Sequence, residues 1–181
     1  MFDTRRKKLL ESLPSHSITL FFSGKAPYKI GDETYEFSVD RNFYYLTGLD
    51  RENMVLALFK GEDLTEELLF IEQYDEAQAK WVGGKMFPDE ASEISDIEEI
   101  YWVEEIMEIL GSRISRLYDH EERVQVFADF TKQEPYQEDR ASFTFCRELL
   151  KLYPYIELRN VAEKITCRCE IHQAGRCKMC D

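Results

Sequence analysis

Three short apolar runs, each bounded by polar or glycine-containing turns, constrain this chain most. Ile18–Phe22, Met54–Phe59 and Leu68–Ile71 are rich in leucine, aromatic and β-branched side chains. Apolar runs of about four to eight residues between turn signals are typical of buried β-strands. The polar stretch Lys60–Asp63 contains a glycine and separates the second run from the third. The sequence therefore predicts a β-hairpin at this place.

Along the rest of the chain, segments whose apolar residues have helical spacing alternate with further short apolar runs. Helices are predicted at Thr4–Leu13 (ended by Pro14), from Asp89, from the end of the next strand through Ile109, and at Gln137–Leu152. Further strands are predicted at Tyr35–Val39, Ile97–Val103, Arg116–Tyr118, Val124–Phe127 and Tyr155–Leu158. Lys25–Asp32 has the composition of a loop. This alternation predicts an α/β layer fold with a mixed sheet.

Composition excludes several classes of protein. The chain has 23 Lys and Arg residues against 36 Asp and Glu residues, a net charge of −13, which argues against nucleic-acid binding. With 44% hydrophobic residues it can bury a core, yet no apolar run approaches the roughly 20 residues of a membrane span. The basic start is not followed by an apolar stretch, so we expect no secretory signal. A cytoplasmic domain is the expectation.

Cysteines divide the chain into two parts. Only Cys146 precedes residue 167, which excludes a disulfide framework and fits a reducing compartment. The last fifteen residues hold possible zinc ligands: Cys167, Cys169, His172, Cys177 and Cys180. Their Cys-x-x-Cys pair suits tetrahedral zinc, but the Cys-x-Cys pair does not, and few apolar residues accompany them. We expect a domain at 1–166 and a disordered or non-native tail at 167–181.

No complete active site can be assembled from residue types and spacing alone. His16 and His120 are expected on the surface, and Cys146 is expected to be a small core residue. The stretch Gly83–Gly84 is expected to form a turn. Nucleotide-binding glycine loops and serine-nucleophile motifs are absent from the sequence. No catalytic residue and no metal ligand is therefore predicted in the body of the chain.

One tract points to a known family. The tract Asp40–Gly48 reads DRNFYYLTG and resembles the signature of the N-terminal domain of Xaa-Pro aminopeptidases, the relatives of aminopeptidase P, prolidase and creatinase. The neighbouring segments come in the order found in that domain. They are the strand ITLFF before the tract, and the two apolar strands and Trp81-Val82-Gly83 after it. The resemblance extends over about residues 1–165.

This resemblance implies a fold and a parent activity. The family domain is a mixed sheet flanked by helices, of ribonuclease-H-like architecture, and it contributes to oligomer contacts and substrate access. In full-length relatives a second, pita-bread domain holds two divalent metals, often manganese, which activate water for attack on the bond before proline. We expect no cofactor in this chain, manganese in the parent enzyme, and no activity of this chain alone. The expected partners are the catalytic domain or a homologous subunit, with proline-containing peptides as the parent's substrates.

The resemblance also suggests roles for individual residues. Trp81 matches a Trp-x-Gly element and is the candidate for lining a substrate cleft, with packing under a loop as the alternative. Asp40, Arg41 and Asn42 are expected to fix a turn through side-chain bonds to the backbone. Tyr44 and Tyr45 are expected in the core or an interface, and Gly48 ends the tract.

At Cys167 the resemblance stops together with the change in composition. A truncated or frameshifted reading frame is one explanation, and a natural tail is the other. Two alternative functions stay open at this point. The chain could be a stand-alone binding or regulatory module that pairs with a separate catalytic chain, or the tail could make it a small zinc-binding protein.

Overall fold

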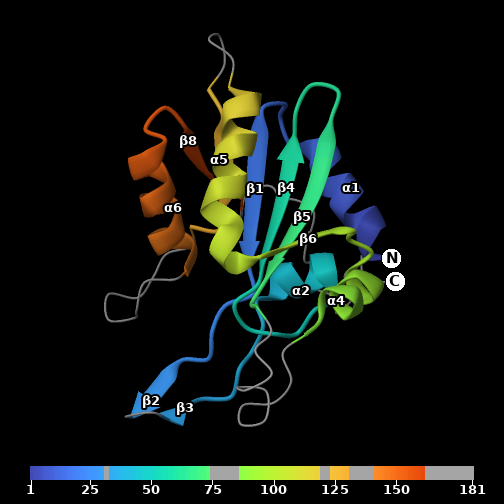
Figure 1. Ribbon diagram of the computed structural model, residues 1–181, viewed down its shortest axis with the longest axis vertical. Coiled ribbons are helices and arrows are strands. Elements are labelled where there is room, and N and C mark those ends of the chain that lie inside the picture. The colour runs from blue at the N-terminus through green and yellow to red at the C-terminus, as the bar shows by residue number, and fades with distance from the viewer. Residues whose placement is uncertain (31–32, 74–85, 119–122, 131–140, 162–181) are drawn as a thin grey trace, which may run out of the picture.

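A six-stranded mixed β-sheet forms the centre of the computed structural model, which describes residues 1–30, 33–73, 86–118, 123–130 and 141–161. The strand order is β6-β5-β4-β1-β7-β8 (Figure 1). The strands are β1 (Ser17–Phe22), β4 (Val55–Lys60), β5 (Thr65–Ile71), β6 (Glu99–Trp102), β7 (Gln125–Ala128) and β8 (Glu157–Asn160). Strand β4 is antiparallel to both of its neighbours, whereas the other neighbouring pairs are parallel. The predicted mixed sheet is confirmed.

Helices cover both faces of this sheet (Figure 1). One face carries α1 (Phe2–Ser12), α2 (Arg41–Thr47) and α4 (Pro88–Ser95), and the other carries α5 (Ile106–Leu117) and α6 (Ala141–Leu152). Alternate residues of β4 serve the two cores: Leu56 and Leu58 face the first group of helices, while Val55 and Phe59 face the second. Because every β4 residue from Val55 to Phe59 is buried, the strand is apolar throughout rather than alternating.

The hairpin predicted from the two apolar runs is confirmed. Strands β4 and β5 pair antiparallel from Lys60 opposite Thr65 to Val55 opposite Phe70. The helices predicted near the N-terminus, after residue 88 and before Leu152 are also present, as are the strands at β1, β6, β7 and β8. A short 3-10 turn, η1 (Val103–Glu105), leads from β6 into α5.

Two strand predictions are wrong. Tyr35–Val39 is not a strand, because this segment makes isolated backbone hydrogen bonds, such as Tyr35 N–H to Pro27 O (2.8 Å), in place of a ladder. The short strands here are instead β2 (Tyr28–Ile30), within the predicted loop, and β3 (Glu33–Thr34), and the pair projects beyond one end of the sheet (Figure 1). Arg116–Tyr118 is also not a strand, because the apolar stripe of α5 continues through Leu117 and extends the helix.

No helix in the described part of the chain is both long and apolar enough to cross a bilayer.

Candidate functional site

The signature tract forms helix α2 together with its two caps. The Asp40 carboxylate accepts hydrogen bonds from the backbone N–H groups of Asn42 (2.8 Å) and Phe43 (3.1 Å), which satisfies two donors that a helix start leaves unpaired. Gly48 ends the helix in the left-handed conformation with φ of 73°, where glycine has no steric penalty. Asp40 and Gly48 therefore set the two ends of α2.

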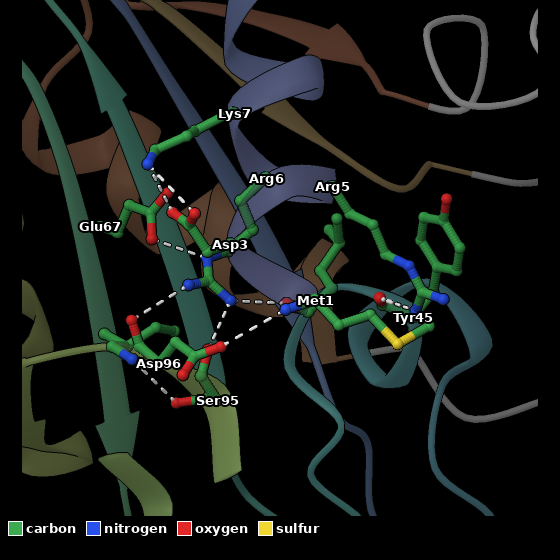
Figure 2. Close-up of polar contacts among 11 residues, drawn as sticks. Met1, Asp3, Arg5, Arg6, Lys7, Tyr45, Glu67, Ser95 and Asp96 are labelled. Atoms are coloured by element: carbon green, nitrogen blue, oxygen red, sulfur yellow. Dashed lines mark hydrogen bonds and ion pairs between the residues drawn. The ribbon is translucent and has the colours of Figure 1, made fainter. Parts of the chain in front are cut away.

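Gly48 also permits a close contact with the N-terminal helix. The Phe2 ring from α1 occupies the space that a Cβ at residue 48 would need, so a side chain there would overlap that ring. Beside it, the Arg5 guanidinium lies 4.1 Å from the centroid of the Tyr45 ring and donates a 2.8 Å hydrogen bond to the Tyr45 carbonyl (Figure 2). Helix α1 thus packs against both the C-terminal turn of α2 and its cap.

A buried arginine, Arg6, makes four hydrogen bonds at this site. The Arg6 side chain is 0% exposed. Its Nε donates to Glu67 Oε2 of β5 at 2.6 Å, as Figure 2 shows. Its Nη1 donates to the carbonyls of Leu46 (2.9 Å) and Ser95 (2.8 Å), and its Nη2 donates to that of Asp96 (3.3 Å).

These contacts join four elements through one side chain. Leu46 lies in α2, Ser95 and Asp96 end α4, and Glu67 lies in β5. The two carbonyls of Leu46 and Ser95 belong to the last turns of their helices, where backbone acceptors lack intrahelical donors and a cation is favoured. A buried charge is tolerated only when it is paired and hydrogen-bonded, and Arg6 meets both conditions. We refer to Arg6, Glu67, Leu46, Ser95 and Asp96 as the Arg6 cluster.

Sequence reasoning missed Arg6, although a signal was present. Arg6 stands among Arg5, Lys7 and Lys8 in the predicted helix Thr4–Leu13, and this basic run does not by itself single out one buried member. Yet Leu9, Leu10 and Leu13 follow at spacings of three, four and seven, which places Arg6 on the apolar face of the helix. A cation on such a face predicts a buried partner, and Glu67 is that partner.

A second cation contacts the C-terminal end of α1. The Lys60 ammonium, at the end of β4, donates to the carbonyls of Leu10 and Leu13, both at 2.7 Å. These carbonyls lie in the last turn of the helix, where positive charge is favourable. Lys60 therefore ties the C-terminal end of α1 to the end of β4.

The remaining signature residues divide between surface and interior. Tyr44 is 49% exposed and Arg41 is exposed, whereas Tyr45 is half-buried against Arg5. Arg41 and Asn42 are the first residues of α2. Trp81 lies outside the described residues, as do His120 and the tail residues Cys167, Cys169, His172, Cys177 and Cys180.

The described part of the chain offers little for nucleophilic or metal chemistry. Burial raises the pKa of the Cys146 thiol to about 12, so the reactive thiolate is disfavoured there. His16 is half-buried and has φ of 55°; it lines a shallow pocket of about 240 Å³ beside Arg113 and Arg116. Among the described residues, no group of three or more His, Cys, Asp or Glu side chains is placed to hold a metal ion.

Comparison with known proteins identifies the family. The model of the aminopeptidase P N-terminal domain matches residues 2–121, about two-thirds of the chain. The chain belongs to this family. It is 28% identical over 116 residues to the Xaa-Pro aminopeptidase of Haemophilus influenzae, with 64% of this chain and 27% of that protein covered. It is 31% identical over 112 residues to the mitochondrial intermediate cleaving peptidase 55 of Arabidopsis thaliana, with 61% and 22% covered.

Solved structures agree with the family assignment. A structure described as an aminopeptidase P from Bacillus anthracis superposes with a TM-score of 0.81 at 30% identity, covering 93% of this chain and 39% of that one. The low-pH form of Escherichia coli aminopeptidase P gives a TM-score of 0.72 at 19% identity, covering 93% and 38%, and shows the shared fold. The chain thus spans about a quarter of the curated relatives' length and about two-fifths of the solved structures.

Proposed function

We propose that this chain provides the N-terminal, non-catalytic domain of an Xaa-Pro aminopeptidase-like metallopeptidase. In this proposal it contributes to oligomerisation and to substrate access, and hydrolysis before proline takes place in the rest of the enzyme. One observation carries the proposal: the superposition uses 93% of this chain but only 39% of the Bacillus anthracis aminopeptidase P. The similarity is thus to one domain of a larger enzyme.

The signature tract supports a structural role for this domain. Asp40 and Gly48 cap α2, the Leu46 carbonyl binds Arg6, and Tyr45 stacks on Arg5. Asp40 stabilises the start of α2 itself, while Leu46, Tyr45 and Gly48 contact α1. The tract therefore supports a rigid scaffold rather than a set of catalytic side chains.

The strand directions support a role in substrate access. Within the six-stranded sheet, all strands except β4 run the same way, so their carboxyl ends lie at one end of the sheet, where the β2–β3 hairpin also projects (Figure 1). Ligands of open α/β sheets bind outside this end of the strands. Trp81 falls between the carboxyl end of β5 and the start of α4. We assign it to the wall of a neighbouring catalytic domain's cleft.

The parent chemistry is assigned to the other part of the enzyme. Bound manganese would activate the water that attacks the peptide bond before proline. The described residues of this chain do not offer a ligand set that fits such a metal. The proposed parent acts on proline-containing peptides in the cytoplasm.

Two experiments test this function. The purified chain, incubated with an Xaa-Pro dipeptide or tripeptide with and without manganese, is expected to release no amino acid, while the Escherichia coli enzyme serves as the positive control. Turnover that follows the chain through purification would overturn the proposal. In the second experiment, residues 1–161 replace the matching part of the Bacillus anthracis protein. A folded chimera is expected to cleave Xaa-Pro peptides whenever the parent does, and a folded but inactive chimera would contradict the domain assignment.

A further inference from the structure

An apolar groove lies between α5 and α6, two helices that lie side by side on one face of the sheet (Figure 1). Its volume is about 790 Å³, and ligand pockets of proteins typically measure about 300–1,000 Å³. Five of its apolar side chains are half-buried or exposed: Phe22, Val103, Met107, Phe145 and Leu152. Phe22 and Phe145 contact each other, with ring centroids 5.5 Å apart, whereas Leu152 is 60% exposed. Other residues that the structure describes therefore leave part of this apolar surface uncovered.

The groove lies where the parallel strands of the sheet end. Phe22 is the last residue of β1, and Glu72 and Val103 directly follow β5 and β6; all three line the groove. Ligands of open α/β sheets bind outside the carboxyl ends of the strands. The position of the groove, as well as its volume, is thus that of a binding site.

The charged residues that line the groove do not by themselves select a positive or a negative partner. They are Lys25, Glu72, Glu148 and Lys151, two of each sign. Glu148 and Lys151 pair with each other within α6 at 2.6 Å. A preference for one sign of charge has to come from the rim of the groove.

The rim on the α5 side is acidic. The Tyr153 hydroxyl, just after α6, occupies the space that a Cβ at residue 111 would need, so the side of α5 that carries Gly111 faces α6. Met107 lies one turn before Gly111 on that side and lines the groove. Glu108 lies about 100° further round the helix, toward solvent, and Glu104 precedes it by four residues. Both carboxylates are exposed, and neither pairs with a basic residue in the described part of the chain.

This rim belongs to a longer segment of negative charge. No Lys or Arg occurs between residues 86 and 112. The acidic side chains of this segment are all exposed: Asp89, Glu90, Glu93, Asp96, Glu98, Glu99, Glu104, Glu105 and Glu108. Since the whole chain also carries −13, the groove is approached through a negative potential.

We propose that the groove between α5 and α6 binds a cationic amphipathic helix of a partner protein. Apolar side chains at helical spacing enter the groove beside Met107 and Leu152, and flanking Lys or Arg side chains pair with Glu104 and Glu108. Charge complementarity selects this partner, because the same rim repels an acidic helix. The inference goes beyond the proposed function and does not depend on it.

A designed peptide serves as the probe. It has about 15 residues, near the length at which isolated helices become stable, with leucines at helical spacing, lysines elsewhere and a fluorescein label. Fluorescence anisotropy with the purified 181-residue chain is expected to give a micromolar Kd. Two control peptides should bind at least about tenfold more weakly: one with glutamates in place of the lysines, and one of unchanged composition whose leucines lack helical spacing.

Leu152→Asp separates binding in the groove from general attraction between opposite charges. The change removes an apolar contact and adds a negative charge, so groove binding should weaken about tenfold, whereas non-specific attraction of a cationic peptide should increase. Leu64→Asp is the matched control. Leu64 is 58% exposed but lies in the β4–β5 turn, so binding should not weaken.

Removal of the rim charges tests the second part of the contact. Glu104→Gln/Glu108→Gln should weaken binding of the leucine–lysine peptide about threefold, as expected for exposed ion pairs. Glu90→Gln/Glu93→Gln makes the same change in net charge on α4, which covers the opposite face of the sheet, and should leave the Kd unchanged. Circular dichroism confirms that each variant is folded; if Leu152→Asp is not, the two glutamine pairs decide.

Several results would overturn the proposal. They are no binding of the leucine–lysine peptide, equal binding of the glutamate peptide, binding that Leu152→Asp does not weaken, and equal effects of the two glutamine pairs. If the chain sediments as a dimer that the peptide dissociates, a second copy occupies the groove and the proposal is also wrong. None of these results changes the peptide-hydrolysis or chimera experiments, so the proposed function is tested separately.

Discussion

Replacing the buried arginine is the sharpest test of what holds this domain together. In Arg6→Met, the methionine keeps an unbranched apolar stem but loses the guanidinium that binds Glu67 and three backbone carbonyls. Glu67 would then be a largely buried carboxylate without its partner, since its side chain is 20% exposed. Removing one member of a buried ion pair costs about 3–5 kcal/mol.

The consequence for unfolding follows from the size of the chain. Domains of comparable length lose about 2–4 °C in Tm per kcal/mol, so Arg6→Met should lower Tm by roughly 6–20 °C. Urea unfolding, followed by circular dichroism, measures the free energy directly. Trp102 packs against the core on the same face of the sheet and provides a second probe by fluorescence.

The neighbouring lysine provides a matched control. Lys7 lies on the same helix, and its ion pair with Asp3 is exposed, so Lys7→Met should cost only about 0.3–0.5 kcal/mol. Glu67→Gln retains an acceptor for the Arg6 Nε and should cost about 1–3 kcal/mol. The double variant Arg6→Met/Glu67→Gln should cost less than the sum, because the two residues interact.

An Arg6→Met variant within about 1 kcal/mol of the Lys7→Met control would refute this reasoning. If Arg6→Met does not yield folded protein, Arg6→Lys replaces it in the comparison. Lysine keeps the charge but cannot reproduce the planar set of donors, so its cost should be intermediate. If Arg6→Lys is as stable as the original chain, the set of hydrogen bonds from the planar guanidinium does not contribute to stability.

Three further changes test the caps and the buried thiol. Asp40→Ala should lower the unfolding free energy by about 0.5–2 kcal/mol, whereas Asp40→Asn should retain most of it; equal losses would contradict the capping role. Gly48→Ala should cost about 1–2 kcal/mol from the left-handed backbone, with added cost from the Phe2 ring, and urea midpoints give the value. Because the folded pKa of Cys146 is raised to about 12, its contribution to stability is complete below the unfolded pKa and is lost as pH rises toward 12. In a chain whose four tail cysteines are serines, Cys146 should react with a thiol reagent only on unfolding, and fast labelling of the folded chain would refute its burial.

The local sequence pattern predicted the central sheet because the buried residues of each central strand are contiguous in the sequence. Strands β1, β4 and β5 each contain a run of apolar side chains, and the sharp turn between β4 and β5 leaves them only antiparallel pairing. The strand predicted at Tyr35–Val39 is not formed, for a reason that the alternation of apolar and polar residues does not show. Val39 does pack against the core, but Tyr35 is 56% exposed, and no strand among the residues that the structure describes pairs with this segment.

The Arg6 cluster could not be predicted as a whole, because its members are far apart in the sequence. Leu46, Glu67 and Ser95 come from three elements, and two of them contribute only a backbone carbonyl. A backbone acceptor carries no sequence signal, so neither composition nor motif spacing identifies it. Only the placement of a cation among leucines on one helical face indicated that a partner must exist.

The signature tract illustrates the same distinction between side-chain and backbone roles. Its specificity as a motif would suit a catalytic segment, yet three of its residues have structural roles. Asp40 has to accept two N–H groups, residue 48 needs a left-handed backbone with room for Phe2, and Leu46 presents its carbonyl to Arg6. Arg41 and Tyr44 are the exceptions: both are exposed on α2, so packing within this domain does not account for their side chains.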